Sequence, residues 1–242
     1  MFYFFVKYVV LWTPLHLFFR PWVQGSRNIP KKGAAIFASN HVSFSDSIFL
    51  PLVVRRRITF LAKIDYWRGT GVRGFLIKSF FRGVGQVPVD RSGGSAAEAA
   101  LTTAINILKS GNFLGIYPEG TRAPDGRLYR GRTGVARMAL EAQVPVIPVA
   151  MIGTYEIQPP GKVFPKFGRV GVRFGKPLDF SQYYKDSRNV EVLRKVTNEI
   201  MQAIHKLSGQ EYVDIYATNA KEILRKGKKI QDETNLTEGE NK

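Results

Sequence analysis

The chain contains the stretch Ala34-Ala35-Ile36-Phe37-Ala38-Ser39-Asn40-His41-Val42-Ser43-Phe44-Ser45-Asp46, in which an apolar run passes directly into polar residues. Residues 34–38 follow a turn signal at 31–33 and have the length of a short buried strand. A second apolar run, 48–50, begins what we expect to be a helix that ends before the arginines at 55–57. The stretch therefore predicts a strand, a loop and a helix. His41 would lie at the carboxyl end of the strand and Asp46 at the start of the helix.

His41 and Asp46 can share a hydrogen bond only in such an arrangement. On one continuous helix, side chains five residues apart diverge by about 140°. Across a loop, Asp46 can reach back to one ring nitrogen, which fixes the tautomer and leaves the other nitrogen as a general base. Two alternatives remain at this point. Ser43 and Asp46 also fit a capping box, so that the aspartate would only cap a helix, and His41 would then be an ordinary loop histidine.

Strand and helix patterns alternate along the rest of the chain, which is typical of an α/β fold. We expect strands at 58–62, 83–91, 113–117, 144–150 and 169–174, and helices at 72–82, 95–110, 133–142 and 189–207. The fold class predicted is one α/β domain with a mixed, largely parallel sheet flanked by helices. Its 242 residues suffice for a single buried core. We assign residues 25–225 to this domain and expect 226–242 to be a disordered polar tail.

Composition limits the chemistry that the chain can perform. Cysteine is absent, which excludes disulfides, thiol nucleophiles and cysteine-ligated metals. The three histidines, His16, His41 and His205, are too few for a histidine-rich metal centre. We therefore expect no metal and no bound cofactor. The formal net charge of +17 indicates an anionic partner, such as nucleic acid, an anionic membrane surface or a phosphorylated substrate.

Residues 1–24 are rich in aromatic and aliphatic side chains. The uncharged run 8–19 lies between Lys7 and Arg20 and is shorter than the roughly 20 residues needed to span a bilayer. No small-residue cleavage site of the signal-peptide kind follows it. We predict a membrane-interface segment, with a buried core helix as the alternative. The basic, amphipathic segment 66–82 is a second candidate for membrane contact.

Polar side chains follow three of the predicted strands. His41 and Asp46 follow the first, Arg91 ends another, and Glu119-Gly120-Thr121-Arg122 follow a third. Ligand sites in α/β sheets form outside the carboxyl ends of strands, so these groups can converge on one cleft. Arginines suit a phosphate monoester, and no G-x-S-x-G nucleophile elbow is present. A general base beside arginines that bind a phosphate (a phosphate cradle) favours direct attack by a substrate hydroxyl on an activated acyl carbonyl.

Four ordered blocks of sequence carry a family resemblance. They are residues 40–46 with the pattern N-H-x₄-D, Val89-Asp90-Arg91, Pro118-Glu119-Gly120-Thr121-Arg122, and Val144-Pro145-Val146-Ile147-Pro148-Val149. In these blocks the chain resembles the glycerolipid acyltransferases, typified by 1-acyl-sn-glycerol-3-phosphate (lysophosphatidic acid) acyltransferase. The resemblance covers about residues 28–174. Val87-Pro88 and Ser45 depart from the usual pattern, so the preference for acyl chain or acceptor can differ from that of the type member.

The resemblance implies a function and roles for particular residues. His41 would deprotonate the acceptor hydroxyl and Asp46 would hold His41, while Arg91, Glu119, Gly120, Thr121 and Arg122 would bind the acceptor phosphate and glycerol. The Val144–Val149 block would line the acyl or donor pocket, although its β-branched residues also suit a core strand. A fatty acyl group would pass from acyl-CoA or acyl-carrier protein to 1-acyl-glycerol 3-phosphate. The product would be phosphatidic acid for phospholipid biosynthesis, made without a covalent acyl-enzyme.

Three alternatives remain open from the sequence. The acceptor can be glycerol 3-phosphate or another lysolipid, or water can replace it, which would make the protein a thioester hydrolase. From a different class, a non-enzymatic basic module would bind membranes or nucleic acid through its charge alone. Under the enzyme hypothesis we expect no nucleic-acid partner. We expect a peripheral or monotopic membrane protein, on the cytoplasmic face of the cell membrane.

Overall fold

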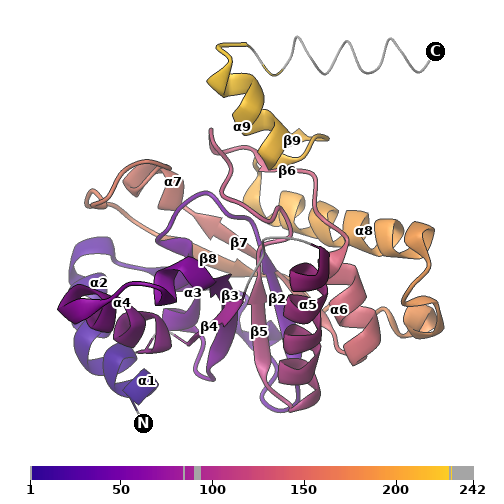
Figure 1. The fold of residues 1–242 in the computed structure, drawn as a ribbon, viewed down its shortest axis with the longest axis horizontal. Coiled ribbons are helices and arrows are strands. Elements are labelled where there is room, and N and C mark those ends of the chain that lie inside the picture. Colours follow the sequence, from indigo (N-terminus) through magenta and orange to yellow (C-terminus); the bar gives the residue numbers. More distant parts are fainter. Residues whose placement is uncertain (1, 84, 90–93, 229, 231–242) are drawn as a thin grey trace.

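A sheet of seven strands forms the centre of the computed structural model, which describes residues 2–83, 85–89, 94–228 and 230 (Figure 1). The strands are β1 (Trp22–Gln24), β2 (Ala35–Ser39), β3 (Ile58–Lys63), β4 (Gln86–Val89), β5 (Phe113–Ile116), β7 (Val146–Ile152) and β8 (Gly171–Phe174). Their order is β1-β8-β7-β2-β5-β3-β4. Neighbours pair in parallel except β7 with β8, which are antiparallel. The prediction of a mixed, largely parallel sheet is confirmed.

Helices cover both faces of this sheet. The helices of the described residues are α1 (Phe2–Phe5), α2 (Trp12–Phe19), α3 (Asp46–Val53), α4 (Gly71–Gly83), α5 (Gly94–Lys109), α6 (Gly134–Ala142), α7 (Thr154–Ile157), α8 (Val190–Ser208) and α9 (Ala217–Arg225), the last of which packs outside this sheet. A π-helical segment, Val6–Leu11, joins α1 to α2. The four helices expected at 72–82, 95–110, 133–142 and 189–207 are thereby confirmed. The predicted tail, 226–242, lies outside the described residues from 229 onward, apart from Ile230.

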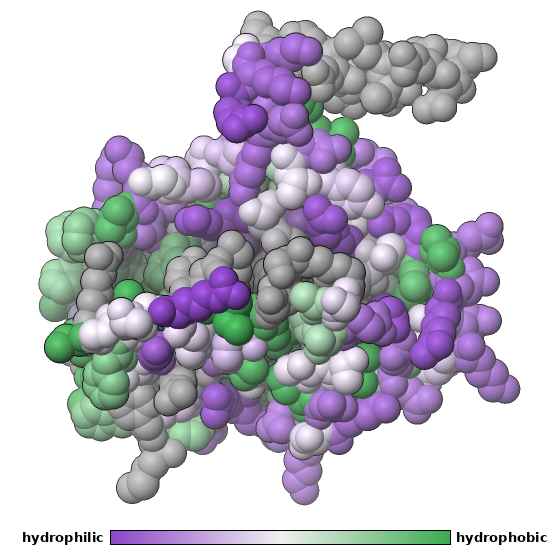
Figure 2. Space-filling model, in the orientation of Figure 1, coloured by the Kyte–Doolittle hydropathy of each residue, from purple (hydrophilic) through white to green (hydrophobic). Residues whose placement is uncertain are grey.

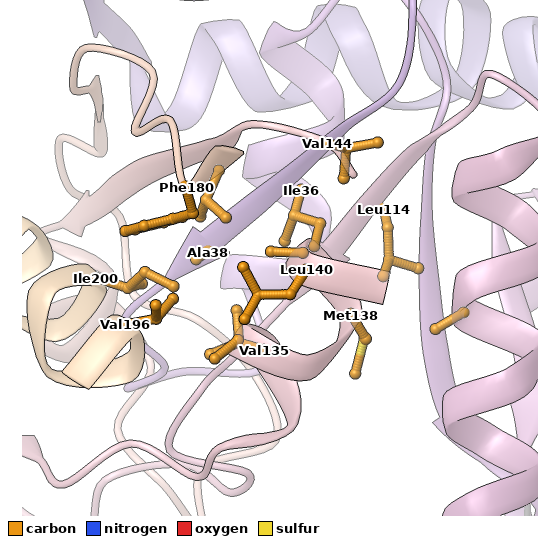
Figure 3. Packing of buried hydrophobic residues seen from close by; sticks show 14 of the residues in the cluster. Ile36, Ala38, Leu114, Val135, Met138, Leu140, Val144, Phe180, Val196 and Ile200 are labelled. Carbon is orange, nitrogen blue, oxygen red and sulfur yellow. The ribbon is translucent and has the colours of Figure 1, made fainter. Parts of the chain in front are cut away.

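The central strands are buried on both faces, which explains why β2 is apolar up to its last residue, Ser39. Ile36 and Ala38 face a cluster formed with α5, α6 and α8, whereas Ala35 and Phe37 face a cluster formed with α2 and α3. Figure 3 shows the first cluster, in which Val196 and Ile200 of α8 approach β2 and α6. Burying each such side chain contributes about 1.5–3 kcal/mol. The central strand is therefore fixed from both sides, and its carboxyl end is a rigid place for a functional group.

The N-terminal segment packs partly on this core. Tyr3, Val6 and Phe19 are buried, and the Lys7 ammonium donates a hydrogen bond to the carbonyl of Val54. Large apolar side chains on the outside of the same segment are exposed: Phe4, Phe5, Tyr8, Val9, Val10, Trp12, Leu17 and Phe18. The buried-helix alternative thus describes only the inner side of the segment. The outer side is apolar and exposed, and its contact with a membrane stays a prediction. None of the helices in the described ranges has the length and apolar character needed to cross a membrane.

Short strands at both ends of the chain differ from the sequence expectation. β1 lies within residues 1–24 and pairs with β8 as an edge strand of the sheet, so that the segment predicted as an anchor ends in the sheet. Near the C-terminus, β9 (Tyr212–Val213) pairs in parallel with β6 (Leu128–Tyr129), and α9 follows it. Figure 1 shows α9 beyond β6 and β9, on the side of the molecule where the loop after β5 lies. Strands of two or three residues are too short to show a period of two.

Candidate active site

The loops after β2 and β5 meet because these two strands are neighbours and run in parallel. His41 lies in the first loop, and residues 117–122 form the second. The backbone N–H of Ala123 donates to the carbonyl of His41 over 2.7 Å, which joins the two loops directly. The candidate catalytic and binding residues of two of the sequence blocks therefore lie together at the carboxyl ends of the parallel strands, where ligand sites of α/β sheets are expected.

The hydrogen bond predicted between His41 and Asp46 is present. Nδ1 of His41 lies 2.9 Å from Oδ2 of Asp46, and the same oxygen accepts the backbone N–H groups of Val42 and Ser43 at 2.8 Å each. Asp46 is fully buried as the first residue of α3, whose N-cap is Ser45. The capping-box alternative is met in part, because Asp46 accepts the backbone N–H of Ser43 and the Ser43 hydroxyl accepts that of Ser45. The aspartate does not only cap the helix, however, since the same oxygen is hydrogen-bonded to His41.

The surroundings of His41 favour the neutral imidazole. Burial lowers the pKa of His41, and the nearby cations Arg122 and Lys221 lower it further, while the hydrogen bond to Asp46 opposes them. A neutral ring that donates from Nδ1 to Asp46 carries its lone pair on Nε2. His41 also lines the cavity described below. The arrangement presents an oriented proton acceptor to whatever occupies that cavity.

Tyr117 supports the imidazole from one side. Its ring stacks on that of His41 with centroids 3.8 Å apart and planes inclined by 10°, and its hydroxyl lies 2.9 Å from Oγ of Ser47 on α3. The sequence analysis missed this residue. The available signal was its position at the end of a predicted strand, directly before the Pro118–Arg122 block.

The Glu119 side chain links two loops by hydrogen bonds. Its carboxylate is fully buried, with Oε1 accepting the backbone N–H of His41 and Oε2 that of Tyr129, both at 3.0 Å. Burial raises the pKa of Glu119 to about 8. Glu119 does not line the cavity described below. The structure therefore gives Glu119 a positioning contact on His41, and its contact with substrate stays a prediction.

The Asn40 side chain also holds the loop that carries His41 in place, by hydrogen bonds to β7. Its side-chain Oδ1 accepts the backbone N–H of Met151 at 2.7 Å, and its Nδ2 donates to the carbonyl of Met151 at 3.1 Å and to Oε1 of Gln210 at 2.7 Å. The paired bonds fasten the end of β2 to β7. The asparagine of the N-H-x₄-D block thus fixes the loop from which His41 projects.

A cavity of about 810 Å³ opens beside His41. The part of its lining next to His41, called its polar end below, consists of His41, Ser47, Gly120, Thr121, Arg122 and Arg132. The rest, called its apolar end, comes mainly from β3, β4, β5, α5 and α6 and is mostly apolar (Phe60, Ala62, Leu101, Ile116, Val135 and Met138), but it also includes Gln86, Glu98 and Arg137. The Val144–Val149 block, predicted to line the acyl or donor pocket, is absent from the cavity walls formed by the described residues. That prediction is wrong, because the strand part of the block, in β7, is buried in the sheet between β2 and β8.

Cations from three segments gather at the polar end. Arg122 and Arg132 line the cavity, and Lys221 of α9 donates to the Thr121 hydroxyl over 2.5 Å. Gly120 has a φ of +76°, and a Cβ there would lie 3.1 Å from Cδ and Nε of Arg132, so glycine suits both its backbone and its neighbour. Burial and the charge of Arg122 lower the pKa of Lys221. Arg91, also predicted to bind the phosphate, lies outside the described residues.

Lys221 and Arg132 are the functional candidates to which sequence reasoning assigned no role. Arg132 stood in an evident basic cluster with Arg127 and Arg130, but nothing in the pattern distinguished the one that enters the cavity. Lys221 is 100 residues from Thr121 in the chain. No local pattern indicates that α9 returns to the strand ends, because the pairing of β6 with β9 brings it there.

The fold and the site together define a class of α/β protein. In this class a histidine–aspartate pair at the ends of parallel strands faces a cavity with one cationic and one apolar end. Residues 20–152, just over half of the chain, match the family model described as Acyltransferase. The chain belongs to this family, and the resemblance in the four sequence blocks is confirmed.

Known proteins similar to the chain carry closely related names. It is 30% identical over 177 residues to the chloroplastic 1-acyl-sn-glycerol-3-phosphate acyltransferase LPAT1 of Arabidopsis thaliana, which covers 71% of this chain and 48% of the plant protein. The enzyme named 1-acyl-sn-glycerol-3-phosphate acyltransferase in Bacillus subtilis is 27% identical over 76% of this chain and 88% of its own length. The chain thus spans about half the length of the plant relative.

A solved structure has the same fold. The crystal structure of the 1-acyl-sn-glycerophosphate (LPA) acyltransferase PlsC from Thermotoga maritima matches with a TM-score of 0.64 and 31% identity. The match covers 85% of this chain and 78% of the Thermotoga chain. The similarity therefore extends well beyond the residues that match the family model.

Proposed function

We propose that the protein is a 1-acyl-sn-glycerol-3-phosphate O-acyltransferase of phospholipid biosynthesis. It transfers a fatty acyl group from acyl-CoA or acyl-carrier protein to the free hydroxyl of 1-acyl-glycerol 3-phosphate and so makes phosphatidic acid. The observation that carries this proposal is the His41–Asp46 pair at the polar end of a cavity that is cationic near His41 and apolar farther in. The names of the similar proteins support the same acceptor.

His41 acts as the base. Nε2 takes the proton of the acceptor hydroxyl as its oxygen attacks the thioester carbonyl carbon. The tetrahedral intermediate collapses, the C–S bond breaks, and the leaving thiolate takes the proton from Nε2. Asp46 holds the Nδ1 tautomer and stabilises the imidazolium between the two steps. The acyl group passes directly between substrates, and the chain forms no covalent intermediate.

The cationic end of the cavity binds the acceptor phosphate. Arg122, Arg132 and Lys221 supply positive charge within the same region as His41, and the Thr121 hydroxyl and Gly120 complete the wall. A phosphate monoester near neutral pH carries between one and two negative charges, and guanidinium groups bind its oxygens bidentately. We include Arg91 in this cradle on the strength of its sequence block alone.

The apolar end of the cavity holds the acyl chain of the lipid acceptor. Its walls come from β3, β5, α5 and α6, and the total volume falls within the roughly 300–1,000 Å³ of ordinary small-molecule sites. A lysophosphatidate carries both a phosphate and an acyl chain, so it matches the two ends of this cavity better than glycerol 3-phosphate does.

The exposed apolar side chains of residues 4–18 support membrane association. Side chains such as Phe4, Tyr8 and Trp12 are exposed on one surface of a segment whose other side packs on the core. Aromatic residues of this kind prefer the headgroup region. The protein would act as a peripheral or monotopic membrane enzyme at the cytoplasmic face of the cell membrane, where its lipid substrate is located.

An activity panel with purified full-length protein tests the proposal. Acyl-CoA and acyl-carrier protein are each offered with 1-acyl-glycerol 3-phosphate, with glycerol 3-phosphate and with no acceptor, and the products are separated. We expect phosphatidic acid from the lysophosphatidate, and a loss of about 10²–10⁴ in kcat for His41→Ala with an unchanged circular dichroism spectrum. Near-normal turnover by His41→Ala would overturn the mechanism. Free fatty acid formed at equal rates with and without acceptor would show a hydrolase instead.

A further inference from the structure

The loop between α7 and β8 exposes large apolar side chains. Val163 is 77% exposed, Phe164 85% and Phe167 76%. Lys162 directly precedes Val163 and Lys166 directly precedes Phe167, and both lysines are also exposed. Exposing three such side chains within five residues is costly in water, and a contiguous group of this kind marks an interaction site.

The base of this loop, residues 158–168, is held in place by hydrogen bonds. Nε2 of Gln158 donates to the carbonyl of Val163 at 2.8 Å, and the backbone N–H of Lys166 donates to the carbonyl of Ile157 at 2.8 Å. At Gly168 a Cβ would lie 2.6 Å from Cγ2 of Ile157, so the returning chain passes close to α7. The apolar side chains therefore project from a constrained turn.

The loop is continuous with the apolar surface of the N-terminal helices. The Phe167 ring stacks on that of Phe18 with centroids 5.1 Å apart, and its centroid is 6.5 Å from that of Phe19. Figure 2 shows apolar residues gathered along the left edge of the molecule, over the part that Figure 1 labels α1, α2 and α4. The loop and α2 thus form one exposed apolar surface built from two distant segments of the chain.

The charge of this surface identifies its partner. Residues 1–24 and 158–170 contain no aspartate or glutamate, whereas Arg20, Lys162, Lys166 and Arg169 are all exposed. Apolar and aromatic side chains ringed by basic ones match an anionic lipid surface, where the rings enter the headgroup region and the cations meet lipid phosphates.

We propose that the loop 162–167 inserts Val163, Phe164 and Phe167 into the interface of an anionic phospholipid bilayer, as a second contact beside α2. The inference rests on the proposed function in one respect. An enzyme whose acceptor is a membrane lipid has to bind the membrane, and this apolar, basic surface would provide that contact. It assigns the membrane contact to a loop far in sequence from the N-terminal segment.

One side chain connects this loop to the catalytic loop. Gln158, which is buried, accepts hydrogen bonds at Oε1 from the hydroxyls of Ser45 at 2.5 Å and Ser43 at 3.4 Å. Ser45 immediately precedes Asp46, and Ser43 lies three residues before it. Binding of the loop to the bilayer would thus also restrain Gln158, and through Gln158 the loop that carries His41 and Asp46.

Vesicle flotation tests the proposal without reference to activity. The full-length wild type and the Val163→Ser/Phe164→Ser double variant are floated with vesicles of phosphatidylcholine and phosphatidylglycerol. We expect the double variant to bind at least about tenfold more weakly, because one buried Val or Phe side chain alone accounts for that factor. Val190→Ser is the matched control for the valine change. Val190 is 76% exposed on α8, which packs on the opposite face of the sheet from α2, and its variant should float as the wild type does.

Two further variants and one activity ratio complete the test. Lys162→Gln/Lys166→Gln should weaken flotation on anionic vesicles and leave binding to pure phosphatidylcholine at the wild-type level. The rate of acyl transfer to lysophosphatidate in vesicles, divided by the rate to a short-chain, water-soluble lysophosphatidate, should fall in the Val163→Ser/Phe164→Ser variant.

Equal flotation of that variant and the wild type would overturn the proposal. So would a loss of self-association in the variant without a loss of flotation, since the surface would then pair two copies. Absence of acyl transfer by the wild type to either acceptor would instead refute the proposed function and leave the flotation result standing.

Discussion

The imidazole of His41 lies almost parallel to the ring of Tyr117, with 3.8 Å between their centroids. The tyrosine hydroxyl in turn contacts Ser47 on the helix that begins with Asp46. His41 is therefore confined by a carboxylate at Nδ1 and by an aromatic face along its ring. Both restraints come from residues beyond the histidine's own strand.

Tyr117→Phe and Tyr117→Ala separate the two contributions of this tyrosine. The phenylalanine variant keeps the stack and loses only the hydroxyl contact with Ser47, so we expect kcat within a few-fold of wild type and a loss of about 0.5–1.5 kcal/mol in the free energy of unfolding. The alanine variant removes the face that supports the ring, and kcat should fall more than about tenfold with KM changed much less. Steady-state kinetics and urea denaturation measure these quantities. A wild-type kcat for the alanine variant would show that the stack has no role in positioning.

Asp46→Asn tests the second restraint. The amide presents an N–H₂ group near a site where the carboxylate accepts three N–H donors, and it removes the charge that stabilises imidazolium. We expect kcat to fall by about 10²–10⁴. Asp125→Asn is the matched control, since the Asp125 carboxylate accepts from the Tyr129 hydroxyl and Arg127 at 2.8 Å each and does not line the cavity. The control can lose stability, but its kcat should stay near that of wild type. Equal losses in both variants would mean that Asp46 acts only through stability.

The sequence predicted those parts of this site that are local in the chain. The apolar run of β2 and the His41-to-Asp46 spacing lie within thirteen residues, so pattern and loop geometry sufficed. The complete burial of Glu119 could not be predicted, because a carboxylate is rarely buried completely and the two backbone N–H groups that make this possible come from separate loops. The β7 block was placed in the cavity by family resemblance, although its β-branched residues already indicated a core strand.

Long-range contacts account for what the sequence missed. Lys221 reaches Thr121 only because β6 and β9 pair, and each of those strands has two residues. Tyr117 owes its importance to the register of β2 with β5, which sets the two strand ends side by side. The overall α/β alternation was evident from periodicity, but the identity of the groups that converge depends on the tertiary fold.

The pH dependence of activity should reveal the charge around His41. Catalysis needs the neutral imidazole, so activity is lost as pH falls through the His41 pKa, which burial and two cations hold below its ordinary value. Lys221→Gln removes one of these cations. Protonation becomes easier, the pKa rises, and the ascending limb of the kcat/KM profile moves to higher pH.

Lys226→Gln is the control for this shift. It makes the same change in net charge at the end of α9, where Lys226 pairs with Glu222, away from the cavity. Its profile should coincide with that of wild type. An equal shift in both variants would indicate a general charge effect, and an unmoved limb for Lys221→Gln would count against Lys221 as a neighbour of His41.

The apolar end of the cavity should set the acyl-chain preference. Gly115 of β5 lies against Phe60, and a Cβ at this glycine would come within 2.3 Å of two atoms of the Phe60 ring. Because Phe60 lines the cavity and also stacks on Tyr117 with centroids 5.6 Å apart, Gly115→Ala must displace the ring and reduce the space between β3 and the helices. We expect kcat/KM for long-chain substrates to fall relative to that for medium-chain ones.

Gly134→Ala provides a matched comparison in the same cavity. Gly134 is the first residue of α6, and the nearest atom to its added Cβ is Cε of Met138 at 3.8 Å, an ordinary contact. This variant should keep the wild-type chain-length ratio. Thermal melts of both variants establish that the proteins compared are folded. Only Gly115→Ala can displace the Phe60 ring into the space assigned to the acyl chain. If this variant also kept the wild-type ratio of long-chain to medium-chain kcat/KM, the acyl chain would have to lie elsewhere.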